Sequence, residues 1–203
     1  MTNPIYYLPG ANGQLHSGLG QALVERGFAP QGRATVGAFK RLSFDEQVSI
    51  VADDLQQPLW WAETARIITN SYGSYLFLHA QLLMPAHPAS ILMLSPILGA
   101  FENGATGQAF VPPYADRLFA TAQRGTFPTP PRLIIHTGSE DWQSPPASAV
   151  AFGELTGAAV HVAHGRGHML GKDYVGPLLD GWLRNSPTRS DSVLASTQHD
   201  LLR

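Results

Sequence analysis

Short apolar segments typical of buried β-strands recur along this chain of 203 residues, and segments with helical patterns separate them. Parallel strands must be joined by long crossover connections, usually helices, so this alternation predicts a parallel sheet. We therefore expect an α/β fold with an open, mostly parallel sheet of about six strands and helices on both faces. The expected strands are residues 5–8, 28–35, 66–69, 91–94, 133–136 and 160–162, and the expected helices are residues 15–26, 43–57, 75–84, 146–155 and 174–183.

Composition argues against several classes of protein. The chain carries 13 Lys and Arg against 15 Asp and Glu, a formal net charge of −2, and it has no basic block that would bind nucleic acid. No apolar stretch approaches the roughly 18 residues of a membrane-spanning helix, and the first residues lack the pattern of a secretory signal. Cysteine is absent, which removes disulfides, thiolate nucleophiles and cysteine zinc ligands. We expect a cytoplasmic protein, and the oligomeric state, a homodimer included, stays open.

Length and pattern together predict one domain over residues 1–185. Residues 97–132 interrupt the alternation with a long connection rich in proline and aromatic residues. A connection of this length inside a small domain is usually functional, and its aromatic residues argue against disorder, so we expect a lid over the binding site. Residues 186–203 are polar and rich in Ser and Thr, which predicts a flexible tail.

A turn with a central serine follows the expected strand at residues 66–69. The segment Thr69-Asn70-Ser71-Tyr72-Gly73-Ser74 has small residues two positions before and two positions after Ser71. A sharp turn of this kind between a strand and a helix lifts a serine hydroxyl clear of the sheet, and its neighbours must be small because backbone packs against them. An ordinary helix cap would also explain the pattern.

Acidic residues and histidines follow two later strands. Asp141 lies in a turn directly after residues 133–136, with Glu140 as the alternative acid, and a helix-capping role would also explain an acid there. His164 and His168 follow residues 160–162, separated by two glycines that allow a tight turn. The same glycines disfavour the helix that would set this pair as metal ligands, so we expect no metal site.

The order serine, acid, histidine, each after its own strand, is the chain order of the α/β-hydrolase triad. The sequence resembles the α/β-hydrolase fold family over about residues 4–185, and in particular its small esterase-like members. The resemblance implies that Ser71 is the nucleophile, Asp141 the acid and His168 the base. It also implies an oxyanion hole formed by the amides of Ala11, in the loop after the first strand, and of Tyr72.

One position departs from the family pattern, and one competing motif overlaps the first loop. The family usually has Gly or Ala where this chain has Thr69, which predicts a crowded turn. Residues 10–15, Gly-Ala-Asn-Gly-Gln-Leu, resemble the nucleotide loop of short-chain reductases, but His16 replaces the third glycine. The Tyr-x-x-x-Lys pair of those enzymes is absent as well, because Val36 and His168 stand four positions before Lys40 and Lys172.

These patterns predict a cofactor-independent serine hydrolase that cleaves a small to medium acyl ester through an acyl-enzyme. We expect the substrate pocket to be lined by Phe101, Phe110, Phe119 and Trp142, which would favour an apolar acyl group. A thioesterase or another acyl hydrolase of the same fold, and a non-catalytic ligand-binding protein of this fold, are the alternatives. The expected partner is a small acyl substrate, with no nucleic acid, no cofactor and no metal.

Overall fold

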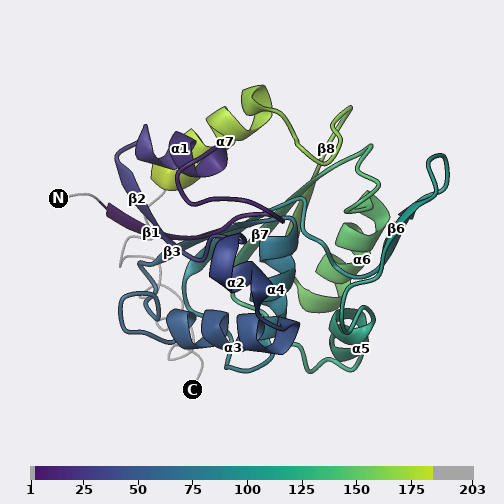
Figure 1. Ribbon diagram of the computed structural model, residues 1–203, viewed down its shortest axis with the longest axis horizontal. Helices are drawn as coiled ribbons and strands as arrows, with labels where there is room; N and C mark the ends of the chain where they lie inside the picture. The colour runs from purple at the N-terminus through teal and green to yellow at the C-terminus, as the bar shows by residue number, and fades with distance from the viewer. Residues whose placement is uncertain (1–2, 185–203) are drawn as a thin grey trace, which may run out of the picture.

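The computed structural model describes residues 3–184, and six strands form a single parallel sheet through the molecule (Figure 1). The strand order is β2-β1-β3-β4-β7-β8, and every neighbouring pair is parallel. The predicted α/β class and the sheet of six strands are confirmed. The strands are β1 Asn3–Leu8, β2 Phe28–Gly32, β3 Arg66–Asn70, β4 Ser90–Leu94, β7 Arg132–Gly138 and β8 Ala159–Ala163.

Helices cover both faces of the sheet, as expected (Figure 1). One face carries α1 (Leu19–Val24) and α7 (Lys172–Arg184), and the other carries α2 (Gly37–Arg41), α3 (Phe44–Leu55), α4 (Tyr72–Gln81) and α6 (Pro146–Thr156). Successive side chains of a strand point to opposite faces. In β1, Tyr6 and Leu8 therefore join the core beneath α3 and α4, whereas Ile5 and Tyr7 join the core beneath α1 and α7.

The strand order reverses between β1 and β3. β2 lies outside β1 at one edge, whereas β3, β4, β7 and β8 follow one another toward the other edge. In open α/β sheets, ligands bind beyond the carboxyl ends of the strands at such a reversal. The turns after Leu8 and Asn70, which end β1 and β3, therefore lie where a site is expected.

Residues 97–132, expected as a lid, contain three short elements. β5 (Phe101–Asn103) and β6 (Gln108–Phe110) form an antiparallel hairpin that projects from the body of the molecule (Figure 1). After the hairpin, α5 (Arg117–Gln123) packs beside α6, where the rings of Phe119 and Phe152 meet at 5.8 Å. The last part of the segment therefore belongs to the core, and the lid function stays a prediction. The tail expected over residues 186–203 lies outside the described residues.

Two helices begin where the local backbone, rather than the hydrophobic pattern, dictates. α1 starts at Leu19 instead of residue 15, because the chain turns back tightly before it: a Cβ on Gly20 would lie 1.8 Å from the Leu15 carbonyl oxygen. α4 starts at Tyr72 instead of residue 75, because the turn at Ser71 leads directly into the helix.

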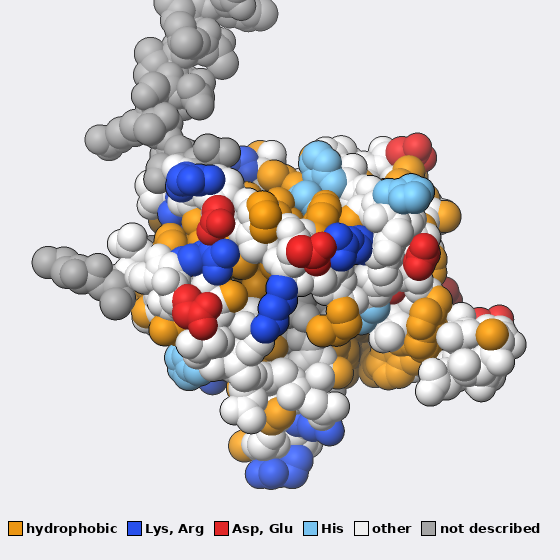
Figure 2. Space-filling model, turned by 90° about the horizontal axis from the view of Figure 1, so that it is seen from above, with side chains coloured by type: hydrophobic (Ala, Val, Ile, Leu, Met, Phe, Trp, Pro, Cys, Tyr) orange, Lys and Arg blue, Asp and Glu red, His pale blue; other side chains and the backbone are white. Residues whose placement is uncertain are grey.

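The surface over α1 and α7 mixes charges of both signs. Figure 2 shows acidic and basic side chains interspersed on this face, without a large patch of one sign. Two ion pairs contribute to the pattern, Arg26 with Asp180 at 2.7 Å and Arg166 with Asp173. Among the described helices, none combines the length and apolar character that crossing a bilayer would require.

Candidate active site

Ser71 lies in a strained turn at the carboxyl end of β3. Its φ of 51° and ψ of −121° are unusual for a residue other than glycine, and such backbone conformations persist only where surrounding contacts hold them. The Ser71 amide donates to the Leu94 carbonyl oxygen at 3.0 Å, and the Ile97 amide donates to the Ser71 carbonyl oxygen at 3.3 Å. The turn is thereby bonded on both sides to the chain that leaves β4.

The small residues around Ser71 have distinct packing reasons. A Cβ on Gly73 would lie 2.2 Å from the Leu8 carbonyl oxygen, so only glycine lets α4 begin this close to β1. Thr69, expected to crowd the turn, is fully buried, and its hydroxyl lies 2.8 Å from the hydroxyl of Ser74. This hydroxyl pair joins the two ends of the turn and accommodates the β-branched residue.

The structure brings Ser71, His168 and Asp141 into one hydrogen-bonded chain. Nε2 of His168 lies 2.9 Å from Oγ of Ser71, and Nδ1 of His168 lies 3.0 Å from each carboxylate oxygen of Asp141. A carboxylate only accepts hydrogen bonds, so Nδ1 of His168 carries the proton on that side. In the neutral imidazole, Nε2 then has a free lone pair directed at the serine hydroxyl.

Asp141 is held at its position by the backbone that follows it. Its Oδ1 accepts from the amides of Gln143 at 3.0 Å and Ser144 at 2.8 Å, and its side chain is fully buried. Of the alternatives that the sequence left open, Glu140 and His164 are exposed, and it is Asp141 and His168 that contact each other. Within residues 3–184, no group of three or more acidic or histidine side chains could hold a metal ion.

A close approach between two loops places this pair. A Cβ on Gly138 would lie 2.0 Å from the Arg166 carbonyl oxygen, so the loop that carries Asp141 touches the loop that carries His168. Two backbone hydrogen bonds join the same loops, from Glu140 to Arg166 at 2.8 Å and from Ser139 to Ala163 at 3.0 Å. Glycine at position 138 is therefore a condition for the contact between acid and imidazole.

The loop after β1, which carries Ala11, lies against the serine turn. A Cβ on Gly10 would lie 3.1 Å from Cβ of Ser71. The Gly10 amide donates to Oδ1 of Asn70 at 3.2 Å, and the same oxygen accepts from the Tyr7 hydroxyl at 3.1 Å. Tyr72 is the first residue of α4, where helix geometry leaves an amide without an intrahelical acceptor. The amides of Ala11 and Tyr72 thus belong to the two segments that meet beside Ser71.

Sequence reasoning missed two side chains that fix the loop after β1. Asn70 binds the Gly10 amide, and buried Thr35 bridges the loop, since its hydroxyl donates to the Gly10 carbonyl oxygen and accepts from the Gly13 amide at 2.9 Å. Asn70 directly precedes Ser71 in the sequence, which is a signal that could have found it. Thr35 carries no comparable local signal.

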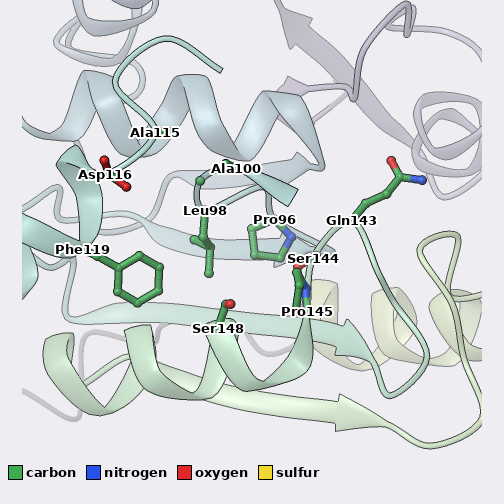
Figure 3. Close-up of a pocket in the computed structure, with 11 residues that line it drawn as sticks. Pro96, Leu98, Ala100, Ala115, Asp116, Phe119, Gln143, Ser144, Pro145 and Ser148 are labelled. Atoms are coloured by element: carbon green, nitrogen blue, oxygen red, sulfur yellow. The ribbon is translucent and has the colours of Figure 1, made fainter. Parts of the chain in front are cut away.

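A cavity of about 170 Å³ is lined in part by the segments that follow β4 and Asp141 in the chain (Figure 3). Two of its lining residues are linked to the triad: the Ser144 amide donates to Asp141, and Pro96 precedes Ile97, whose amide donates to the Ser71 carbonyl oxygen. The lining residues are Pro96, Leu98, Gly99, Ala100, Ala115, Asp116, Phe119, Gln143, Ser144, Pro145 and Ser148.

The four aromatic residues expected to line the substrate pocket lie in two places. Phe119 lines the cavity. Phe101 contacts the rings of Phe110 at 5.3 Å and Trp142 at 5.6 Å, so these three gather between the hairpin and the loop of Asp141. Their role in substrate binding stays a prediction.

Within residues 3–184, three histidines outside the triad are buried, His79, His87 and His136, and burial lowers the pKa of each. His136 approaches the Tyr174 hydroxyl at 2.7 Å and stacks on His161, and burial lowers its pKa to about 4, with a further lowering from His161. His79 lies among the rings of Phe44, Tyr75 and Tyr114. Burial lowers the pKa of His79 to about 4 as well, so both imidazoles are neutral in the folded protein near neutral pH.

Neither a protein-family model nor a curated protein matches this chain. Solved structures do match. Alpha/beta hydrolase domain-containing protein 10 from mouse matches with a TM-score of 0.63 and 13% identity, over 97% of this chain and 91% of that one. Est1E from Butyrivibrio proteoclasticus matches with a TM-score of 0.61 and 15% identity, over 90% and 87% of the two chains. A monoacylglycerol lipase from Paleococcus ferrophilus matches with a TM-score of 0.61 and 13% identity, over 90% and 95%.

These likenesses, together with the strand order and the position of the serine turn, define the architecture. The chain has the α/β-hydrolase fold.

Proposed function

We propose that this protein is a cofactor-independent serine hydrolase that cleaves small to medium acyl esters. The observation that carries the proposal is the hydrogen-bonded chain from Ser71 through His168 to buried Asp141. A nucleophile in contact with a base, which a third group orients, is the arrangement that nucleophilic catalysis requires. Solved structures of this fold include a carboxylesterase and a monoacylglycerol lipase, which supports ester cleavage as the reaction.

In the first half of the reaction, Oγ of Ser71 attacks the ester carbonyl carbon while its proton passes to Nε2 of His168. The negative oxygen of the tetrahedral intermediate accepts hydrogen bonds from the amides of Ala11 and Tyr72, and one such donor typically contributes about 2.7–4 kcal/mol. The partial positive charge at the start of α4 favours the same oxygen. Asp141 holds the imidazole in orientation and stabilises its charged form.

In the second half, the intermediate collapses and the C–O bond to the alcohol breaks. The leaving alcohol takes the proton from Nε2 of His168, and an ester between the acyl group and Ser71 remains. Water then attacks this ester with His168 as base, and the acid product leaves with Ser71 restored. No step requires a group beyond these side chains and water.

Residues 97–132 are part of the proposal as the segment that contacts the substrate. Phe110 is 39% exposed and Val111 is 75% exposed at the end of the hairpin, which leaves apolar surface free beside the loop of Asp141. Apolar side chains in that position favour an apolar acyl group. A thioester would follow the same steps, so the substrate panel includes one.

A fluorophosphonate probe tests the proposal, because it reacts with an activated serine. The wild-type protein is expected to be labelled at Ser71, as located by mass spectrometry of the labelled peptide. Ser71→Ala is expected to abolish labelling, whereas Ser49→Ala, at an exposed position in α3, serves as the matched control. Labelling that persists in Ser71→Ala, or a wild-type protein that is neither labelled nor active on acetyl and butyryl esters and thioesters, would overturn the proposed function.

A further inference from the structure

The cavity shown in Figure 3 combines one acidic side chain, one aromatic ring and aliphatic walls. Asp116 is its only ionisable lining residue, so no Lys, Arg or His side chain from the described part of the chain faces it. Asp116 is the residue immediately before α5, and Phe119 follows it by three positions, a spacing that brings two side chains to the same side of a helix. Figure 3 shows the Phe119 ring, the Leu98 side chain and the Ser148 hydroxyl converging on the cavity.

The Asp116 carboxylate is not engaged elsewhere in the described residues. An Asp immediately before a helix usually accepts a hydrogen bond from an amide of the first turn, but Asp116 makes no such bond to α5. Within residues 3–184, its carboxylate has no hydrogen-bond or ion-pair partner, and neither does the Ser148 hydroxyl. The adjacent Arg117 does not neutralise it by contact, because its guanidinium lies over the Tyr114 ring, 5.5 Å from the centroid.

We propose that this cavity binds a cationic ammonium group of the substrate, with Asp116 and Phe119 as the specificity-determining residues. A carboxylate attracts the positive charge, and the face of an aromatic ring attracts a cation within about 6 Å. The aliphatic side chains of Pro96, Leu98 and Ala115 suit the methylene chain that links the ammonium to the ester. This inference rests on the proposed function, and it narrows the substrate to an ester with a cationic group in its acyl or its alcohol portion.

Matched esters that differ only in charge test the proposal. The first series is p-nitrophenyl 4-, 6- and 8-(trimethylammonio)alkanoates, each compared with the neutral ester in which carbon replaces nitrogen. The second series is trimethylammonioalkyl acetates with two to six methylenes, again with carbon isosteres. At one chain length in at least one series, we expect kcat/KM to favour the cation by about fivefold or more. The preference should weaken as salt is raised, because salt screens exposed charges.

Variants assign the preference to the cavity. Asp116→Asn keeps the shape and removes the charge, so it should abolish most of the preference for the cation, measured as the ratio of kcat/KM for each cationic ester to kcat/KM for its neutral isostere. Phe119→Leu should reduce the preference by about two- to fivefold. Glu102→Gln is the matched control, since it removes the same charge from an exposed position of the hairpin outside the cavity. Loss of the preference in Glu102→Gln to the same extent would overturn the assignment to Asp116.

A binding measurement keeps this inference separate from the proposed function. Pentyltrimethylammonium is not an ester, so its binding needs no catalysis. In a ¹H–¹⁵N NMR titration of the full chain, it should shift the amides of Gly99, Ala115 and Asp116 in the wild type and not in Asp116→Asn. If no ester is hydrolysed but these shifts occur, the proposed function fails and the cation site stands. If esters are hydrolysed with no preference for charge in either series, or the shifts are absent, the cation site is wrong.

Discussion

The turns that carry the triad and the hairpin β5–β6 are anchored in different ways. The turns of Ser71 and Asp141 are each fixed by backbone hydrogen bonds to a neighbouring strand end and by a glycine in close contact, Gly73 at the serine turn and Gly138 at the acid turn. The hairpin has exposed residues throughout 104–111, and a Cβ on Gly104 or Gly107 would meet nothing within 4 Å. The side chains of the proposed triad are therefore positioned by the sheet, whereas we expect substitutions in the hairpin to cost the fold little stability.

The difference between the triad turns and the hairpin would be disproved most clearly if activity did not depend on a triad side chain. His168→Ala is expected to lower kcat by at least about 10³-fold while the protein stays folded, because nothing else then removes the proton from Ser71. His164→Ala, at an exposed position four residues earlier, is the control and should keep near-normal activity. Steady-state kinetics on an acetyl ester checks both, and the reverse pattern would assign the base to His164.

A titratable side chain, His79, lies where residues 97–132 pack against the core, in contact with the ring of Tyr114. Its neighbours are the rings of Phe44, Tyr75 and Tyr114, and its charged surroundings are Arg117, which lowers its pKa, and Asp45, which raises it. Burial lowers the pKa of His79 from its ordinary value of 6.5 to about 4 in the folded protein. Between these values the unfolded chain binds more protons, so stability falls as pH decreases from about 6.5 to about 4, by up to about 3 kcal/mol.

Urea unfolding at pH 7 and pH 5 measures this dependence. His79→Leu should reduce the difference between the two pH values, and the remainder should reflect His136 and His87, whose pKa values burial lowers in the same direction. An unchanged difference in His79→Leu would show that His79 does not remain neutral in the fold.

Two glycine substitutions compare the regions directly. Gly138→Ala should lower the free energy of unfolding by about 1–3 kcal/mol, because the new Cβ would meet backbone that must move. It should also lower kcat, since the same movement separates Asp141 from His168. Gly104→Ala in the hairpin should change stability by less than about 0.5 kcal/mol. Thermal unfolding and kinetics of the pair check the expectation, and equal effects would remove the distinction between the regions.

Substitutions of Asn70 test whether the loop after β1 is held in position by its contact with the serine turn. Asn70→Leu removes the acceptor for the Gly10 amide and should lower kcat about tenfold with little change in KM, because the misplaced Ala11 amide matters most in the transition state. Asn70→Asp keeps an acceptor and should recover much of the loss. A change confined to KM, or to the thermal midpoint, would show that Asn70 has no positioning role.

The smallest expected effect lies in the hairpin. For the wild type, kcat/KM should rise by up to about fourfold for each CH₂ of the acyl chain that contacts apolar surface, about 0.8 kcal/mol per group. Phe110→Ala should flatten this rise while leaving turnover of the acetyl ester nearly unchanged. An unaltered chain-length profile would place the acyl group away from the hairpin.

Local patterns in the sequence were enough to predict the architecture and the candidate triad. A strand is marked by a few consecutive apolar residues and a helix by side-chain periodicity, so the six strands could be located without knowledge of their neighbours. Ser71, Asp141 and His168 could be selected because each follows a strand directly, and parallel strands bring their carboxyl ends to one edge of the sheet.

Tertiary packing determines which of two neighbouring side chains makes each contact, and what surrounds the site. Asp141 rather than Glu140 meets His168 because the loops join at Gly138, a contact with Arg166 that no local pattern encodes. Asn70 reaches Gly10 across 60 positions, and Thr35 reaches it across 25. The composition of the cavity, with Asp116 opposite the loop of Ser144, depends on how α5 packs on α6. Such contacts arise from the packing of whole elements, whereas sequence patterns report only the face and the period of each one.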